Sequence, residues 1–143
     1  MSVDLVQLSS GALGMAGTAG TATAGFVAQS FRMTSASVDE AVFVADRPFV
    51  VIGIRCFLTT AGTDAGAATA VIRKVPSGVA IASGTLLHTG SLNLKGTAVT
   101  TQTLTVSTTA SDLLMAAGDA LAIDFTGVLT SVAGAVTISL APA

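Results

Sequence analysis

The sequence contains few side chains that could carry out catalysis, and its only histidine, His88, is the first of them to consider. An imidazole can act as general base beside a serine nucleophile, and serines are plentiful in this chain. However, neither a GxSxG motif nor another nucleophile motif accompanies the segment LLHTG around His88. A histidine beside a glycine turn is most simply an exposed loop residue. We therefore predict no catalytic residue and no enzymatic activity.

Carboxylates are the second group of candidates, because loop carboxylates can bind calcium. Asp64, Asp119 and Asp124 could together form such a site. Asp119 has a structural alternative, since it can accept hydrogen bonds from backbone N–H groups of its own glycine turn. Asp39 and Glu40 are sequential, so on a strand they would point to opposite faces and could not act as a pair. HExxH, CxxC and DxDxDG motifs are absent, and the sequence predicts neither a metal site nor a cofactor.

The single cysteine and two of the arginines could serve reactivity or binding. Cys56 shares its alternating face with apolar residues, which indicates a small buried hydrophobe rather than a reactive thiol. Arg55 and Arg73 lie within expected strands, on faces that are otherwise apolar or small. Each could lay its stem over apolar surface with its head in water. Alternatively, each could anchor an interface, since arginine is enriched there, and we treat both as candidate interface residues.

The composition indicates a chain that stays in contact with other molecules. Hydrophobic residues make up 51% of the sequence and charged residues only 10%, whereas about 25% charged residues is usual in soluble domains. Tyr and Trp are absent, so the surface must consist largely of hydroxyl and methyl groups. A surface so poor in charge predicts a stable homo-oligomer or a permanent partner.

Charge and hydropathy patterning argue against two classes of partner. The net charge is −2 and no basic stripe is present, which argues against direct binding of nucleic acid. The longest apolar stretches are interrupted by Asp46, Arg47 and Arg55, well short of the roughly 18 residues of a membrane span. The N-terminus also lacks the basic region of a secretory signal peptide. We expect no membrane association.

Residues 1–25 differ in composition from the rest and are expected to form an N-terminal arm. Glycine recurs at every third position, at Gly11, Gly14, Gly17 and Gly20. Such a backbone cannot fix its own conformation, because glycine loses the most entropy on ordering. We predict a flexible or extended arm that becomes ordered on a neighbouring molecule. Its apolar residues are candidate interface residues: Val3, Leu5, Val6, Leu8, Leu13 and Met15.

Residues 26–143 show the alternation typical of β-strands and are expected to form one domain. The clearest strand is residues 48–58, PFVVIGIRCFL, where Pro48 suits the first position. One face of this strand would carry only apolar side chains and lie on the core. Its members are Val50, Ile52, Ile54, Cys56 and Leu58.

Seven further strands are predicted along the domain. They cover residues 26–33, 38–45, 67–75, 79–86, 98–107, 121–125 and 134–140. The turn Pro76-Ser77-Gly78 would have proline second and glycine fourth, making residues 79–86 the hairpin partner of residues 67–75. About eight strands with turn signals about 8–12 residues apart, and no amphipathic helix, predict an all-β fold: an antiparallel β-sandwich or jelly roll.

Three segments form a further pattern: VFVADRPFVVIGIRCFLTTAGTDAG (residues 42–66), VIRKVPSGVAIASGTLL (71–87) and LLMAAGDALAIDFTG (113–127). Together they resemble the head decoration, or cement, proteins of tailed bacteriophages. The similarity covers roughly residues 38–140 and concerns the style of the sequence rather than a strict motif. It implies a jelly-roll domain, self-association and binding to the major capsid protein on the outer surface of the head. It also implies a location in the virion after synthesis in the host cytoplasm.

The resemblance leaves alternatives for function and assembly. A cement protein would bridge neighbouring shell subunits against the pressure of packaged DNA, with the arm docked on an adjacent subunit. The competing hypotheses are a tail or head-fibre module that binds a receptor or glycan, and a β-sandwich enzyme that uses His88 or paired carboxylates. The scarcity of aromatic side chains weakens the glycan hypothesis. A dimer and a trimer are both compatible with the sequence, and we favour a dimer at a two-fold position of the shell.

Overall fold

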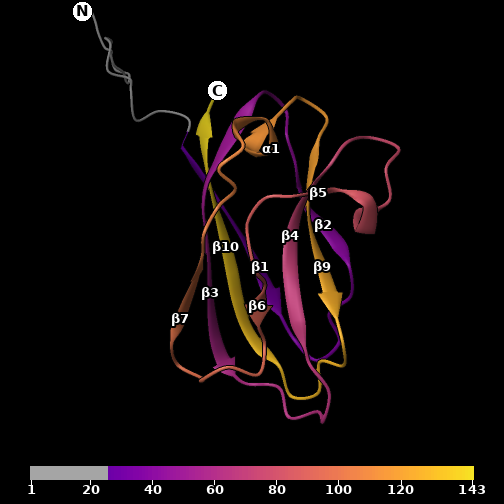
Figure 1. Cartoon of the computed structure of the whole chain (residues 1–143), viewed down its shortest axis with the longest axis vertical. Coiled ribbons are helices and arrows are strands. Elements are labelled where there is room, and N and C mark those ends of the chain that lie inside the picture. Colours follow the sequence, from indigo (N-terminus) through magenta and orange to yellow (C-terminus); the bar gives the residue numbers. More distant parts are fainter. Residues whose placement is uncertain (1–25) are drawn as a thin grey trace, which may run out of the picture.

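The computed structural model describes residues 26–143, where β-strands make up most of the regular structure (Figure 1). The predicted arm and its six candidate interface residues lie outside this range. In chain order the elements are β1 (Val27–Met33), β2 (Glu40–Val44), β3 (Phe49–Thr60), β4 (Thr69–Val75), the 3-10 helix η2 (Ile81–Ser83), β5 (Thr85–Leu86), β6 (Leu92–Asn93), β7 (Thr101–Leu104), α1 (Ala110–Leu113), β8 (Leu114–Met115), β9 (Ala120–Thr126) and β10 (Ala133–Pro142). No helix in the described range is long and apolar enough to cross a membrane.

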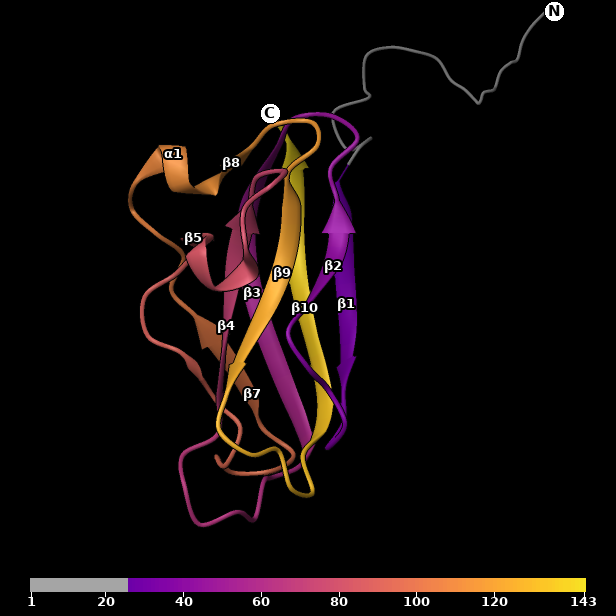
Figure 2. The same cartoon turned by 90° about the vertical axis from the view of Figure 1, so that its right-hand side faces the viewer.

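The strands form two antiparallel sheets that pack face to face (Figure 2). The first sheet has the order β1-β10-β3-β7, and the second has the order β2-β9-β4-β5. The short strands β8 and β6 pair with β3 and β4, so β7 and β8 share one strand position and β5 and β6 share another. Numbering these positions along the chain gives the orders 1-8-3-6 and 2-7-4-5, which is the jelly-roll arrangement. The predicted antiparallel sandwich is confirmed, with ten strands because two positions are split.

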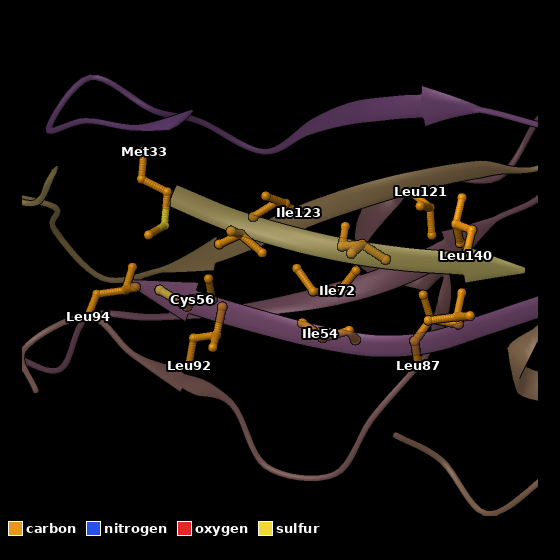
Figure 3. Close-up of a cluster of buried hydrophobic side chains, with 14 of the residues drawn as sticks. Met33, Ile54, Cys56, Ile72, Leu87, Leu92, Leu94, Leu121, Ile123 and Leu140 are labelled. Carbon is orange, nitrogen blue, oxygen red and sulfur yellow. The ribbon is translucent and has the colours of Figure 1, made fainter. Parts of the chain in front are cut away.

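The core is the apolar layer between the two sheets (Figure 3). On β10 the side chains of Val136, Ile138 and Leu140 are fully buried, and they alternate with outward Thr137 and Ser139. Each such side chain contributes roughly 1.5–3 kcal/mol on burial. The domain is therefore held mainly by the inward rows of its long strands.

The first half of β3 faces the opposite way from the prediction. Ile52 is 51% exposed and Val50 is only partly buried, although both were expected in the core. The second half of the strand faces the core as predicted. The buried residues of β3 are Phe49, Val51, Ile54, Cys56 and Leu58.

A β-bulge in the ladder between β3 and β10 causes this reversal. Gly53 lies opposite Ser139 and Val51 lies opposite Leu140, so Ile52 has no partner on β10. One extra residue on a strand moves every later side chain to the other face. The alternation read along the sequence was therefore correct on only one side of Ile52.

Residues 79–86 do not form the predicted hairpin strand, because only the two residues of β5 pair with β4. The N–H of Val79 donates to the carbonyl of Pro76 at 3.1 Å, and Gly78 has a φ of 85°. Proline is therefore the first residue of the turn and glycine the third, one position away from the prediction. The following helix η2 lies against β9 and β4. It covers the outer side of the second sheet, where Ala122 is fully buried.

Gly118 and Gly127 both have left-handed backbone angles, but for different reasons. Gly118 (φ 94°) lies in the predicted turn before β9, and a Cβ there would meet nothing within 4 Å. Gly127 (φ 92°) follows β9, and a Cβ there would lie 1.9 Å from the carbonyl oxygen of Ala67. Gly127 therefore also allows a close backbone approach between the end of β9 and the residues before β4.

The substitution Gly127→Ala is expected to lower the free energy of unfolding by about 2–4 kcal/mol, because backbone strain adds to a clash with Ala67. The matched control Gly118→Ala introduces the strain alone and should cost about 1–2 kcal/mol. Urea unfolding followed by far-ultraviolet circular dichroism measures both values. Equal losses for the two variants would contradict the close approach.

Candidate functional site

His88 is buried, with 4% exposure, so the expected exposed position is wrong. Its Nε2 accepts a hydrogen bond of 2.9 Å from the N–H of Ile72. Its Nδ1 lies 3.2 Å from the carbonyl oxygen of Thr89, which fits a neutral ring with its proton on Nδ1. Burial lowers the pKa of His88, and the nearby positive charge of Arg73 lowers it further. Both ring nitrogens serve the fold, which argues against a role as general base.

His88 lies where the strand position next to β4 is divided into β5 and β6. After β5 the chain departs from β4: Leu87 still donates its N–H to the carbonyl of Ile72 at 3.1 Å, but its own carbonyl accepts the N–H of Ser107. Residues 87–89 thereby pair with residues 105–107 at the edge of the first sheet. This pairing includes an antiparallel bridge between His88 and Val106 and joins the two sheets along one side. The departure takes away a backbone acceptor from the N–H of Ile72, and the imidazole replaces it.

The carboxylates considered for calcium are engaged at separate places in the fold. Asp124 forms an ion pair with Arg73 at 2.7 Å. Asp119 accepts the N–H of Ala116 at 2.9 Å, which confirms its structural role in the turn. Asp64 accepts a backbone N–H within its own loop. In the part of the chain that the structure describes, no group of three or more His, Cys, Asp or Glu side chains could hold a metal ion.

Arg73 and Cys56 also serve the interior of the domain. The guanidinium of Arg73 donates to Asp124 and, at 2.9 Å, to the carbonyl of Gly84, so it ties the η2 segment to β4. Its role as an interface anchor stays a prediction. Cys56 is 1% exposed, and burial raises the pKa of its thiol to about 11, which confirms the predicted small buried hydrophobe.

In the part of the chain that the structure describes, most residues on the outer side of the first sheet are exposed, and we call this side the arginine face. The strand register places its residues in rows across the sheet: Arg32 with Ala135, Phe57 and Thr101, then Ser30 with Thr137, Arg55 and Thr103, then Ala28 with Ser139 and Gly53. These side chains are mostly hydroxyl or methyl groups, and the hydroxyls of Ser30 and Thr137 lie 3.1 Å apart. No acidic residue belongs to the face.

Arg32 and Arg55 are the two basic residues between positions 26 and 143 for which the structure shows no hydrogen bond or ion pair. The other basic side chains are bound within the domain: Arg47 to Asp46, Arg73 to Asp124, and Lys74 and Lys95 to backbone carbonyls. Sequence reasoning had selected Arg55 but missed Arg32. Only the register of β1 on β10 brings the two arginines to the same face.

Two shallow hollows lie on the surface near these elements. One, of about 370 Å³, is on the arginine face beside Arg32 and Phe57. The other, of about 460 Å³, is almost entirely apolar and lies next to α1, between Val50 and Leu114. Leu114 is 47% exposed, so this second hollow presents apolar surface to solvent.

The substitution His88→Gln is expected to reduce the acid sensitivity of the fold. Because the pKa of His88 is lowered in the folded state, the unfolded chain binds more protons just below pH 6.5, near the ordinary histidine pKa. The stabilising contribution of the neutral ring is thus complete above about pH 6.5 and is lost as the pH falls. A glutamine can accept the same N–H without binding a proton. Urea unfolding at pH 7.5 and 5.5 should show a smaller difference for the variant, and an equal difference would contradict this role.

Comparisons with known proteins give one similarity of fold. No protein-family model matches the sequence, and no curated protein matches it. A solved chain described as "Cyanophage Pam1 capsid asymmetric unit" is similar to this chain, with 18% sequence identity and a TM-score of 0.49. The similarity covers 95% of this chain and 96% of that one.

Proposed function

We propose that this chain is a structural virion protein of a tailed bacteriophage. Its role is that of a decoration, or cement, protein that binds the outer surface of the major capsid protein lattice and stabilises the head. The observation that carries the proposal is that the side chains best suited to catalysis serve the fold instead. His88 supplies an acceptor to β4, Cys56 fills the core, and Asp124 neutralises Arg73. We therefore expect the domain to act through its exposed surface, by binding another protein.

The exposed surface suits contact with protein rather than with small polar ligands. Large apolar side chains are exposed at several places on the described domain, and few charges surround them. The most exposed are Val99 at 70%, Val38 at 63% and Val44 at 60%. Single exposed apolar residues are ordinary, but with so few charged residues they keep the cost of desolvation low when the domain docks. The resemblance to cement proteins, carried by residues 42–66, 71–87 and 113–127, agrees with such a role.

The mechanism would depend on repetition rather than on one strong contact. A shell offers the same site many times, and an oligomer that engages two or more sites gains affinity through effective concentration. Binding only to the assembled shell would stabilise the shell by mass action. Self-association, with a dimer favoured over a trimer, belongs to this proposal.

The arm of residues 1–25 would supply a second contact, docked on an adjacent subunit. Its apolar residues need apolar surface, and the hollow between Val50 and Leu114 on a neighbouring copy has that character. A short apolar segment of the arm that enters such a hollow would bury its own side chains and those that line the hollow.

Immunogold electron microscopy of purified virions tests the proposed function. Antibodies against the domain are expected to label the outer surface of the head. Label confined to the tail would favour the receptor- or glycan-binding alternative. Absence of label from intact virions, with the chain also absent from their protein content, would overturn the structural role.

Deletion of residues 1–20 is expected to abolish occupancy of the head while the domain stays folded, because side chains between Met33 and Leu140 form a continuous core. Quantitative gel analysis of heads mixed with purified protein measures occupancy, and circular dichroism checks the fold. A matched variant, Leu5→Ser with Leu8→Ser, keeps the length of the arm and should lose most of the occupancy. Unchanged occupancy of both variants would refute a role for the arm.

A further inference from the structure

We propose that the arginine face is the docking surface, and that its partner presents carboxylates to Arg32 and Arg55. The inference rests on the proposed function, and it specifies which side of the domain meets the shell and with what chemistry. Its basis is the placement, on one sheet surface without acidic residues, of the two arginines that have no partner within residues 26–143.

The register fixes the arrangement of the two arginines. Arg32 on β1 lies opposite Ala135 of β10, and Arg55 on β3 lies opposite Thr137 of the same strand. They therefore flank β10 diagonally, two strand positions apart sideways and two residues apart lengthwise. With a strand spacing of about 4.8 Å and a rise of about 3.4 Å per residue, their Cα atoms are about 12 Å apart. Thr137 lies directly opposite Arg55, on the strand between those that carry the two arginines.

The charges on this face differ from those of the whole chain. The chain carries a net charge of −2, yet the arginine face has two cations and no acid. Each other basic side chain of the described domain already has a partner within the domain. Guanidinium groups form their best contacts with carboxylates, through paired N–H donors. Carboxylates supplied from outside would complete this surface.

The remaining side chains of the face allow a partner to come close. Gly53, Ala135 and Thr137 are small, so the sheet surface is flat around the arginines. Phe57 is 42% exposed and borders the hollow of about 370 Å³ beside Arg32. Phenylalanine and arginine are both enriched at protein interfaces relative to the rest of the surface.

A second copy of this chain does not fit as the occupant through the same face. Two copies face to face would bring together four arginines and no carboxylate, which is unfavourable. The face is also small: four strands at about 4.8 Å and six steps along β3 at about 3.4 Å give a projected area of about 400 Å². Stable complexes bury roughly 800 Å² of accessible surface per partner. Such a contact is weak alone and suits a repeated, acid-bearing surface such as a shell lattice.

The test measures binding of the purified protein to phage heads that lack it. The heads come from the phage that encodes this chain, after deletion of the gene for the chain. The double variant Arg32→Ser with Arg55→Ser is expected to bind at least about thirtyfold more weakly than the wild type. Thr137→Glu, which places a carboxylate beside Arg55, should weaken binding similarly. Two matched controls should bind within about threefold of the wild type. Arg47→Ser removes an arginine paired with exposed Asp46, and Ala41→Glu adds the same charge on the other sheet.

Co-sedimentation at several salt concentrations gives the affinities, and circular dichroism confirms that each variant is folded. Wild-type affinity should fall as salt rises, and the double variant should show a shallower dependence. If the wild type binds the heads and both the double variant and Thr137→Glu bind equally well, the inference is overturned and the proposed function stands. Failure of the wild type itself to bind the heads would overturn the proposed function and the inference with it.

Discussion

Burial of one apolar layer between two sheets is the constraint on which the rest of this domain depends. Cys56 is its single cysteine, and the described residues contain no cluster of metal ligands, so packing must supply the stability. The layer requires that β3 and β10, the two longest strands, keep their apolar side chains inward over their whole length. The bulge at Ile52 satisfies this requirement by changing which residues of β3 face inward.

The same constraint accounts for the fate of the polar side chains. A buried backbone N–H must be paired, and where the chain leaves β4 the imidazole of His88 performs that service for Ile72. Arg73 similarly binds the segment that covers Ala122 on the second sheet. The side chains of His88 and Arg73 are therefore engaged in hydrogen bonds within the domain. The two basic side chains that have no partner within the described domain, Arg32 and Arg55, lie on the same outer face of the first sheet.

Features that depend only on the order of apolar and polar residues within one segment could be predicted from the sequence. The inward rows of β9 and β10 follow from strict apolar alternation, and the turn at Asp119 follows from its residue types. The first half of β3 was mispredicted because a bulge depends on the register of the partner strand, which the local pattern does not contain. His88 was mispredicted for a related reason, since its burial follows from a pairing with residues 105–107 that are distant in sequence. That Arg32 and Arg55 share a face could not be predicted locally, because it depends on the pairing of both their strands with β10.

The pairing of residues 87–89 with residues 105–107 has a consequence for polymerisation. It seals the sandwich along one flank, together with the hydrogen bonds between Gln102 and Asn93. On the opposite flank β1 and β2 each have a strand neighbour on one side only. Within the described domain an incoming strand would therefore find longer uninterrupted edges at β1 and β2 than at the short strands β5 to β8. A second copy that extends a sheet would thus meet the domain most readily along the flank of β1 and β2.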